Sequence, residues 1–132
     1  MKTTQFVATV GPNAGYGHEN ERSADRIRFV WQEEAARHHA ATGVEVSGFV
    51  TTGFTVYRTA DGCPVGGEVT ANVIGVRDPA ADPDDAAWRE AVRAVAAAVG
   101  RRFRQDEVFV TFSPVEFVRV KCGGGEQPDP AA

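Results

Sequence analysis

Apolar and polar positions along the chain follow two different periods, and these periods alternate in a fixed order. Strand-like runs rich in Val, Thr and Phe lie at 5–10, 44–58, 68–76 and 108–120. Two stretches with an apolar residue every three or four positions lie between the first and second runs and between the third and fourth. A period of two is typical of a strand and a period near 3.6 of a helix. The pattern therefore predicts strand, helix, strand, strand, helix, strand.

Local signals mark where the two predicted helices begin and end. The first is expected to run from Ser23 to Thr42, with Ser23 as N-cap and Gly43 as the residue that stops it. For the second, Asp82 suits the cap and Pro83 the first helical position. The apolar stripes that should face the core are Ile27, Trp31, Ala35 and His38 in the first helix, and Trp88, Val92, Val95, Val99 and Phe103 in the second.

This order of segments is that of a ferredoxin-like βαββαβ sandwich, an α+β fold in which two helices cover one face of a four-stranded antiparallel sheet. Pro114 interrupts the last strand and removes a ladder donor, which fits an edge strand. In this fold the second and fourth strands lie at the edges. We expect a single domain over residues 1–122 and a flexible tail over 123–132.

The face of the sheet without helices is the first candidate site. Alternation sends Glu68, Thr70 and Asn72 of the third strand to that face, together with Thr111 of the fourth. Tyr57 lies on the same face if side chains of the second strand keep alternating between the two faces beyond Gly48 and Gly53. Two readings remain open: a half-solvated sheet, or a pocket closed by a second subunit over a small-molecule ligand. Three apolar residues are expected on the same face, Phe49, Ile74 and Phe109. They favour burial of this face against another copy of the chain in a homo-oligomer, in the simplest case a dimer.

The loop from Gly11 to Glu21 is the second candidate site. Its glycines let backbone approach a ligand, and Asn13, Tyr16 and His18 supply donors, acceptors and a group that titrates near neutral pH. The alternative is an ordinary surface connection. The spacing of the glycines matches neither phosphate-binding motif.

Composition and charge exclude several classes of protein. A net charge of −4 gives no basic field for nucleic acid or anionic lipid, so neither partner is expected. The chain carries no export signal and no apolar run of membrane-spanning length, which predicts a cytoplasmic protein. Cys63 and Cys122 are then free thiols, both expected at the surface. No metal-ligand spacing occurs, so we expect neither a metal nor a cofactor.

The segment order over about residues 5–121 resembles the dimeric α+β barrel group of ferredoxin-like proteins, and more distantly the tautomerase-like group. The resemblance implies a ligand held between the open sheet face and the helices or loops. It also implies isomerase, cyclase, monooxygenase or decarboxylase chemistry. Tautomerase-like enzymes use an N-terminal proline as base, whereas Lys2 follows Met1 here. The resemblance rests on segment order and carries over no site residues.

These observations lead to a hypothesis about function. The chain is expected to be a small metal-free enzyme of the isomerase, cyclase or lyase type, acting on a small organic molecule by general acid–base catalysis in specialised metabolism. Glu68 serves as base and His18 as its partner acid. Side chains expected to orient the substrate are Tyr57, Thr70, Asn72, Thr111, Asn13 and Tyr16. The alternative is a non-catalytic module that binds a small molecule or another protein through the open sheet face.

Overall fold

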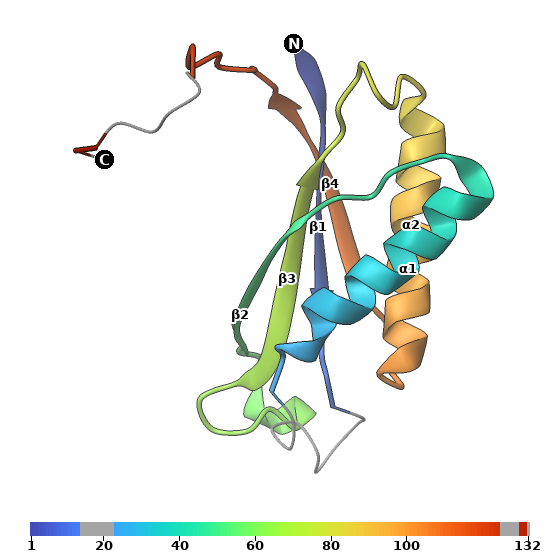
Figure 1. Ribbon diagram of the computed structural model, residues 1–132. Coiled ribbons are helices and arrows are strands. Elements are labelled where there is room, and N and C mark those ends of the chain that lie inside the picture. The colour runs from blue at the N-terminus through green and yellow to red at the C-terminus, as the bar shows by residue number, and fades with distance from the viewer. Residues whose placement is uncertain (14–22, 125–129, 132) are drawn as a thin grey trace.

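The computed structural model describes residues 1–13, 23–124 and 130–131. One four-stranded antiparallel sheet carries two helices on a single face (Figure 1). The element order confirms the predicted βαββαβ sequence and the ferredoxin-like α+β fold. The elements are β1 (Lys2–Val10), α1 (Arg26–Thr42), β2 (Phe49–Thr55), a short 3₁₀ helix η1 (Thr59–Asp61), β3 (Glu68–Val76), α2 (Asp85–Arg102) and β4 (Phe109–Glu116).

The strand order is β2-β3-β1-β4, so β2 and β4 are the edge strands, as predicted. Pro114 lies in β4 opposite Thr4 of β1. An edge strand accepts a proline because only one of its sides has to supply ladder hydrogen bonds.

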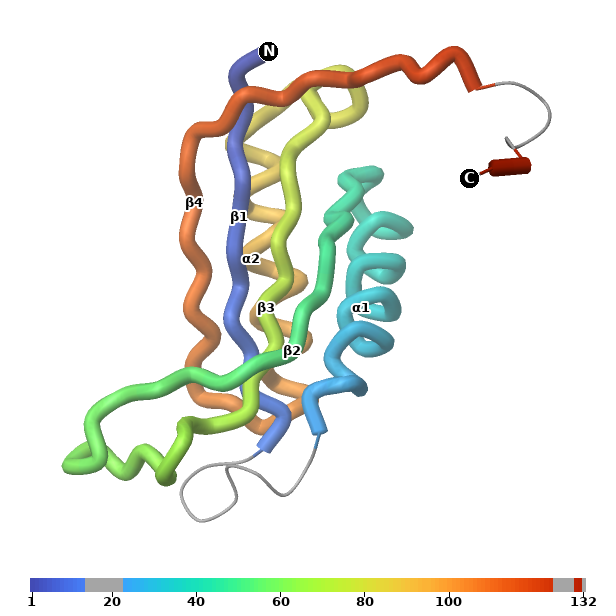
Figure 2. The backbone as a smooth tube through the Cα atoms, turned by 90° about the vertical axis from the view of Figure 1, so that its left-hand side faces the viewer, coloured from blue at the N-terminus to red at the C-terminus, as the bar shows by residue number. Residues whose placement is uncertain are grey.

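The open face of the sheet, turned toward the viewer in Figure 2, carries the polar set predicted from β3. The register places Asn72 opposite both Thr9 of β1 and Thr51 of β2, and Glu68 opposite Thr55. Directly opposite residues in an antiparallel pair share a face. The alternation of β2 therefore continues past Gly53. This is the condition under which Tyr57 is expected on the open face.

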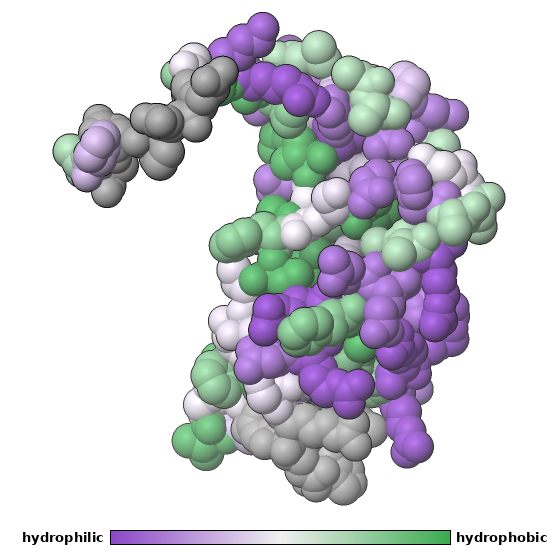
Figure 3. Space-filling view, viewed as in Figure 1, coloured by the Kyte–Doolittle hydropathy of each residue, from purple (hydrophilic) through white to green (hydrophobic). Residues whose placement is uncertain are grey.

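The outer surface differs between the two layers. In Figure 3 the hydrophilic colour dominates the helix side, and hydrophobic patches follow the side of the sheet. Phe49 of β2 is 68% exposed and Phe109 of β4 is 70% exposed. Large apolar side chains therefore lie on the open face, and no other described part of the chain covers them.

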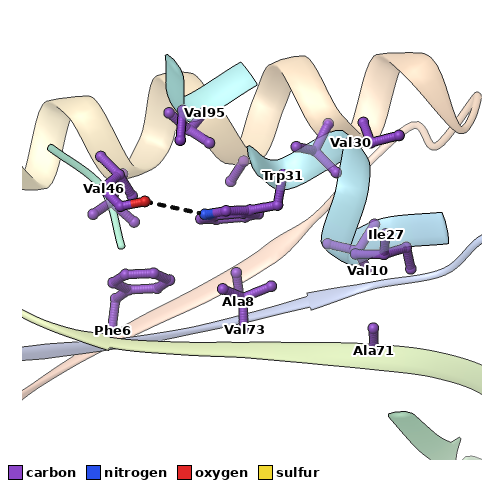
Figure 4. Packing of buried hydrophobic residues seen from close by; sticks show 14 of the residues in the cluster. Phe6, Ala8, Val10, Ile27, Val30, Trp31, Val46, Ala71, Val73 and Val95 are labelled. Carbon is purple, nitrogen blue, oxygen red and sulfur yellow. Dashed lines mark hydrogen bonds between the residues drawn. The ribbon is translucent and has the colours of Figure 1, made fainter. Parts of the chain in front are cut away.

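The core lies between the helices and the other sheet face (Figure 4). The ring of Phe6 stacks on Trp31 with centroids 5.7 Å apart and tilts against Trp88 at 5.8 Å. The Trp31 indole Nε1 donates to the backbone oxygen of Val46 at 3.3 Å, so the buried polar atom of the ring is paired. The whole predicted stripe of α2 is buried, and Ile27, Trp31 and Ala35 of α1 are too.

Both predicted helix starts are corrected. Helix α1 begins at Arg26, because Ser23 does not cap it: the Ser23 hydroxyl accepts from the backbone N–H of Asp25 in the turn before the helix. Helix α2 is capped by Asp84, whose carboxylate accepts from the Ala87 N–H at 3.1 Å. Asp82 instead presents its backbone oxygen to Arg77, which fixes residues 82–83 outside the helix.

The predicted long strand over 44–58 is shorter, because its first residues cross the helix face of β3. Val46 enters the core, and a Cβ on Gly75 of β3 would lie 2.2 Å from the Ser47 oxygen. A Cβ on Gly48 would lie 2.4 Å from Val73 Cγ1. Glycine is needed at both positions for this close approach. The predicted fourth strand is likewise shorter, ending at Glu116.

Residues 56–67 form an arm that projects beyond the end of the sheet before returning to β3 (Figure 2). The expectation that both cysteines are exposed is wrong for Cys63, which is 7% exposed, and right for Cys122. The Cys63 sulfur accepts from the Tyr57 N–H at 3.4 Å and donates to the Pro64 oxygen at 3.3 Å. Both contacts lie within the arm, so the buried thiol helps to fold it.

Candidate functional site

The candidate site lies at one end of the open face, where β1 and β2 end and β3 and β4 begin. A pocket of about 530 Å³ opens there, within the range usual for small-molecule sites. Each strand contributes a residue at its end or just beyond it. The lining residues are Thr9, Gly11, Thr55, Tyr57, Asp61, Glu68, Thr70, Gln105, Glu107 and Phe109.

The pair formed by Tyr57 and Glu68 is the chemical centre of this pocket. The Tyr57 hydroxyl donates to Glu68 Oε2 at 3.0 Å. Glu68 is half-buried at the first position of β3, and the arm brings Tyr57 back over it. Thr70 is buried beside the pair, and its hydroxyl lies 2.9 Å from that of Thr55. The structure therefore brings together three of the residues expected from the sequence, Tyr57, Glu68 and Thr70.

Two other sequence candidates do not line the pocket. The Thr9 hydroxyl donates to Asn72 Oδ1 at 2.7 Å, so Asn72 orients Thr9, which does line it. Thr111 is exposed opposite Val7, two residues farther along β4 than the pocket residue Phe109. Asn72 acts on this pocket through Thr9, and Thr111 faces open sheet surface.

The loop after β1 reaches the pocket through its first residues. Gly11 lines the pocket, and Asn13, which is 4% exposed, accepts through its backbone oxygen from Gln105 Nε2 at 2.5 Å. Tyr16 and His18 lie outside the described residues. The link between Asn13 and Gln105 joins the loop after β1 to the connection between α2 and β4.

The charge of the pocket is negative. Three carboxylates line it, from Asp61, Glu68 and Glu107, and the described lining residues include no lysine or arginine. Arg58 lies beside the pocket and donates to both carboxylate oxygens of Asp61, at 2.9 and 3.1 Å. Those hydrogen bonds raise the pKa of Arg58. Asp61 is therefore neutralised by a neighbour, whereas Glu68 and Glu107 give the pocket its negative character.

Sequence reasoning missed the contribution of the connection before β4. Gln105 and Glu107 lie in a short polar link that carries no motif, and Asp61 precedes Gly62 in a pair that is typical of a hairpin turn. The signal that could have found them is topological. In a βαββαβ sheet the loop after β1 and the connection before β4 lie at the same end as the start of β3, so their polar residues converge there.

A larger cavity of about 690 Å³ lies elsewhere, between α1 and residues 45–50. Its walls include Phe29, Trp31 and Phe49 with a few polar side chains, among them His39. Its hydroxyl–carboxylate contact, from Ser47 to Glu45, is exposed and 3.4 Å long, whereas that of Tyr57 and Glu68 is partly buried and 3.0 Å long. The smaller pocket is therefore the better candidate for a catalytic site, although the cavity beside α1 has the larger volume.

Two further features bear on the class of site. Within the described part of the chain, no three His, Cys, Asp or Glu side chains are grouped so that they could hold a metal ion. No described helix has the length and apolar character to cross a membrane.

The geometry fits a particular kind of ligand. Carboxylates and hydroxyls attract a cation or a group rich in hydrogen-bond donors, and Phe109 offers an apolar surface for a planar ring. The Tyr57–Glu68 pair can hold or accept a proton at a fixed position. The arrangement therefore suits a cationic organic molecule better than an anion.

The chain also matches one family of known proteins. The family model described as SAM lyase matches residues 1–121, which is nearly the whole chain. No curated protein and no solved structure is detectably similar to it. The match names no dimeric α+β barrel family, so of that resemblance only the ferredoxin-like fold of the single chain is shown. The chain belongs to the SAM lyase family, a family of small lyase-like proteins.

Proposed function

We propose that this protein is a lyase whose substrate is S-adenosylmethionine, the compound abbreviated in the name of its family. The observation that carries the proposal is the Tyr57–Glu68 pair inside a pocket lined by carboxylates. S-adenosylmethionine carries two positive charges, on its sulfonium and its ammonium group, against one carboxylate. A negative pocket attracts such a molecule and raises its local concentration.

The bond that a lyase would break is the bond between sulfur and the amino-acid side chain. The electron pair of this C–S bond goes to sulfur, so the sulfonium leaves as the neutral thioether methylthioadenosine. The carbon left behind satisfies its valence without water in one of two ways. Glu68 removes a proton from the next carbon and a double bond forms, or the carboxylate of the substrate attacks the carbon and a cyclic ester forms.

Ring closure is the easier of these two routes. A glutamate carboxylate is a poor base for an unactivated C–H bond, because the rate of proton transfer falls as the base weakens and a carboxylate is a weak base. The substrate carboxylate is already tethered to the reacting carbon, and intramolecular attack gains an effective concentration of about 10⁵–10⁸ M when well oriented. In ring closure Glu68 holds the substrate in the reactive conformation. In elimination it is the base expected from the sequence.

The remaining side chains would orient the substrate. Tyr57 fixes the position of the Glu68 carboxylate, Thr70 fixes Thr55, and Asn72 fixes Thr9. His18 remains our proposal for the partner acid of an elimination. Isomerisation, the third reaction class expected from the sequence, does not release a fragment and falls outside this proposal.

We further propose that a second copy of the chain covers the open face. The exposed rings of Phe49 and Phe109 support this arrangement. Light scattering on the wild type and on a Thr70→Arg/Asn72→Arg variant tests it. A wild-type dimer or larger assembly with a folded monomeric variant is the expected result, and a wild-type monomer would exclude the cover.

The enzymatic proposal is tested by Glu68→Gln, which keeps the shape of the side chain and removes its charge. Turnover of S-adenosylmethionine should fall by about 100-fold or more, because the variant can neither accept a proton nor hold a cation. Glu90→Gln is the matched control, since Glu90 is an exposed carboxylate on α2 that does not line the pocket.

The product separates the two routes. Vinyl proton signals in the amino-acid fragment would identify elimination and make Glu68 the base. A cyclic ester would identify ring closure. Tight binding of S-adenosylmethionine without loss of substrate would instead support the non-catalytic alternative.

A further inference from the structure

Gln105 enters the pocket from a turn that holds its backbone in place. Its N–H donates to the Gly100 oxygen at 2.9 Å, which closes the last turn of α2. Arg104, just before it, has φ of 56°, and it alone has a positive φ among the described residues other than glycine. That conformation is disfavoured for a residue with a Cβ. The chain thus accepts local strain at the residue that positions Gln105.

The side-chain amide of Gln105 has a defined orientation. Its Nε2 donates to the backbone oxygens of Asn13 at 2.5 Å and Phe103 at 3.2 Å. Backbone oxygens only accept hydrogen bonds, so the NH₂ group must face them and the amide oxygen must face away. Gln105 therefore presents an acceptor to the pocket, and it cannot turn over without losing both bonds.

Two acceptor oxygens meet above Gly11. Gln105 Oε1 and Glu68 Oε1 each lie 3.2 Å from the point where a Cβ on Gly11 would be. A side chain at position 11 would press against both oxygens, so glycine is what lets them approach each other here. This corner of the pocket offers oxygens of a carboxylate and a fixed amide to whatever enters it.

We infer that Gln105 and Glu68, over the backbone of Gly11, form the subsite for the α-ammonium group of the substrate. The inference rests on the proposed function. An ammonium has three donors and no acceptor, which matches a corner made of acceptors. The charge of the ammonium group also stays constant while the C–S bond breaks.

The sulfonium fits this corner less well for a catalytic reason. Its positive charge disappears as the bond breaks, so a carboxylate placed on it would stabilise the substrate more than the transition state. Such an interaction slows the chemical step. Holding the ammonium instead anchors the amino-acid chain without opposing the loss of charge at sulfur.

The test compares two thioether probes that lack the sulfonium leaving group and therefore remain intact. One is S-adenosylhomocysteine, and the other is the same compound without its α-amino group. Calorimetric titration of the wild type should show about tenfold weaker binding of the deaminated probe, the effect of one charged hydrogen bond. In Gln105→Leu that ratio should fall to about two.

Gly11→Ala provides a second variant in case Gln105→Leu does not fold. Its methyl group would occupy the corner next to both oxygens, and the ratio should fall to between one and two. An unchanged tenfold ratio in folded Gln105→Leu or Gly11→Ala would overturn the subsite. A wild type that cleaves S-adenosylmethionine but binds both probes equally would overturn the subsite alone. A wild type that neither binds the first probe nor cleaves S-adenosylmethionine would overturn the proposed function with it.

Discussion

The two faces of the sheet are built from the same strands and obey opposite rules. On the helix face, Phe6, Ala71 and Val73 are fully buried in apolar contacts. On the open face, alternate residues of the same strands carry hydroxyl, amide and carboxyl groups that bond to one another, as in the pair of Thr9 and Asn72.

The difference shows how one strand can serve stability and function at once. Burial of apolar area stabilises the helix face, and it leaves the alternate positions free for polar groups that contribute little to folding. Within the described residues no buried side-chain nitrogen or oxygen lacks a partner, so the polar face is ordered without disturbing the core.

The largest contrast is expected between two phenylalanines, one on each face. Phe6→Ala removes a ring stacked on Trp31 and should lower the free energy of unfolding by about 3–5 kcal/mol. Phe49→Ala removes an exposed ring and should change it by less than about 0.5 kcal/mol at protein concentrations where the chain is monomeric. Urea unfolding of both variants measures the difference. Equal losses would mean that the two faces are equally buried.

Two glycines give a smaller and more local contrast. In Gly75→Ala on the helix face, the new methyl would lie 2.2 Å from the Ser47 oxygen and 2.4 Å from the ring of Phe6. The variant should lose at least about 1–3 kcal/mol. Gly53→Ala on β2 meets nothing within 4 Å and should be neutral or up to about 1 kcal/mol more stable. Thermal unfolding of the pair checks both signs.

The smallest effect concerns a carboxylate on the helix side of the sheet. The pKa of Asp85 is lowered below its ordinary value, chiefly by a hydrogen bond from the Thr4 hydroxyl. A hydrogen bond from Arg89 and the positive charges of Arg89 and Arg77 lower it further. A lowered pKa in the folded state stabilises the protein above the ordinary aspartate pKa of about 4. That contribution is lost as the pH falls through the lowered value.

Unfolding free energy measured against pH tests the role of Asp85. Asp85→Asn should flatten the acid side of the profile below about pH 4 and leave its shape near neutral pH unchanged. Asp25→Asn serves as control, because Asp25 precedes α1 without a side-chain capping bond. A profile for Asp85→Asn identical to that of the wild type would contradict the assignment.

Periodicity predicted the fold because burial enforces it. The stripe from Trp88 to Phe103 and the alternation around Asn72 are direct consequences of which side chains must leave water. The capping error at Asp82 arose because Arg77, five residues away in sequence, holds the Asp82 oxygen. The shorter β2 has a similar cause, since the crossing at Gly75 depends on a tertiary contact.

The candidate site was predictable only in part. Glu68 and Thr70 follow from strand alternation, and Tyr57 followed once the alternation of β2 was known. Gln105 depends on a turn with an arginine in the left-handed region, which no local signal announces. Residues that reach a site through such turns are found from the topology rather than from a motif.

The most direct test of the central claim is mass spectrometry of the products formed by purified protein and S-adenosylmethionine. We expect methylthioadenosine together with an amino-acid fragment one water lighter than the product of hydrolysis, and about 100-fold slower formation of both by Glu68→Gln. A fragment that includes the added water from the moment of release, or unchanged rates in Glu68→Gln, would contradict a lyase centred on the Tyr57–Glu68 pair.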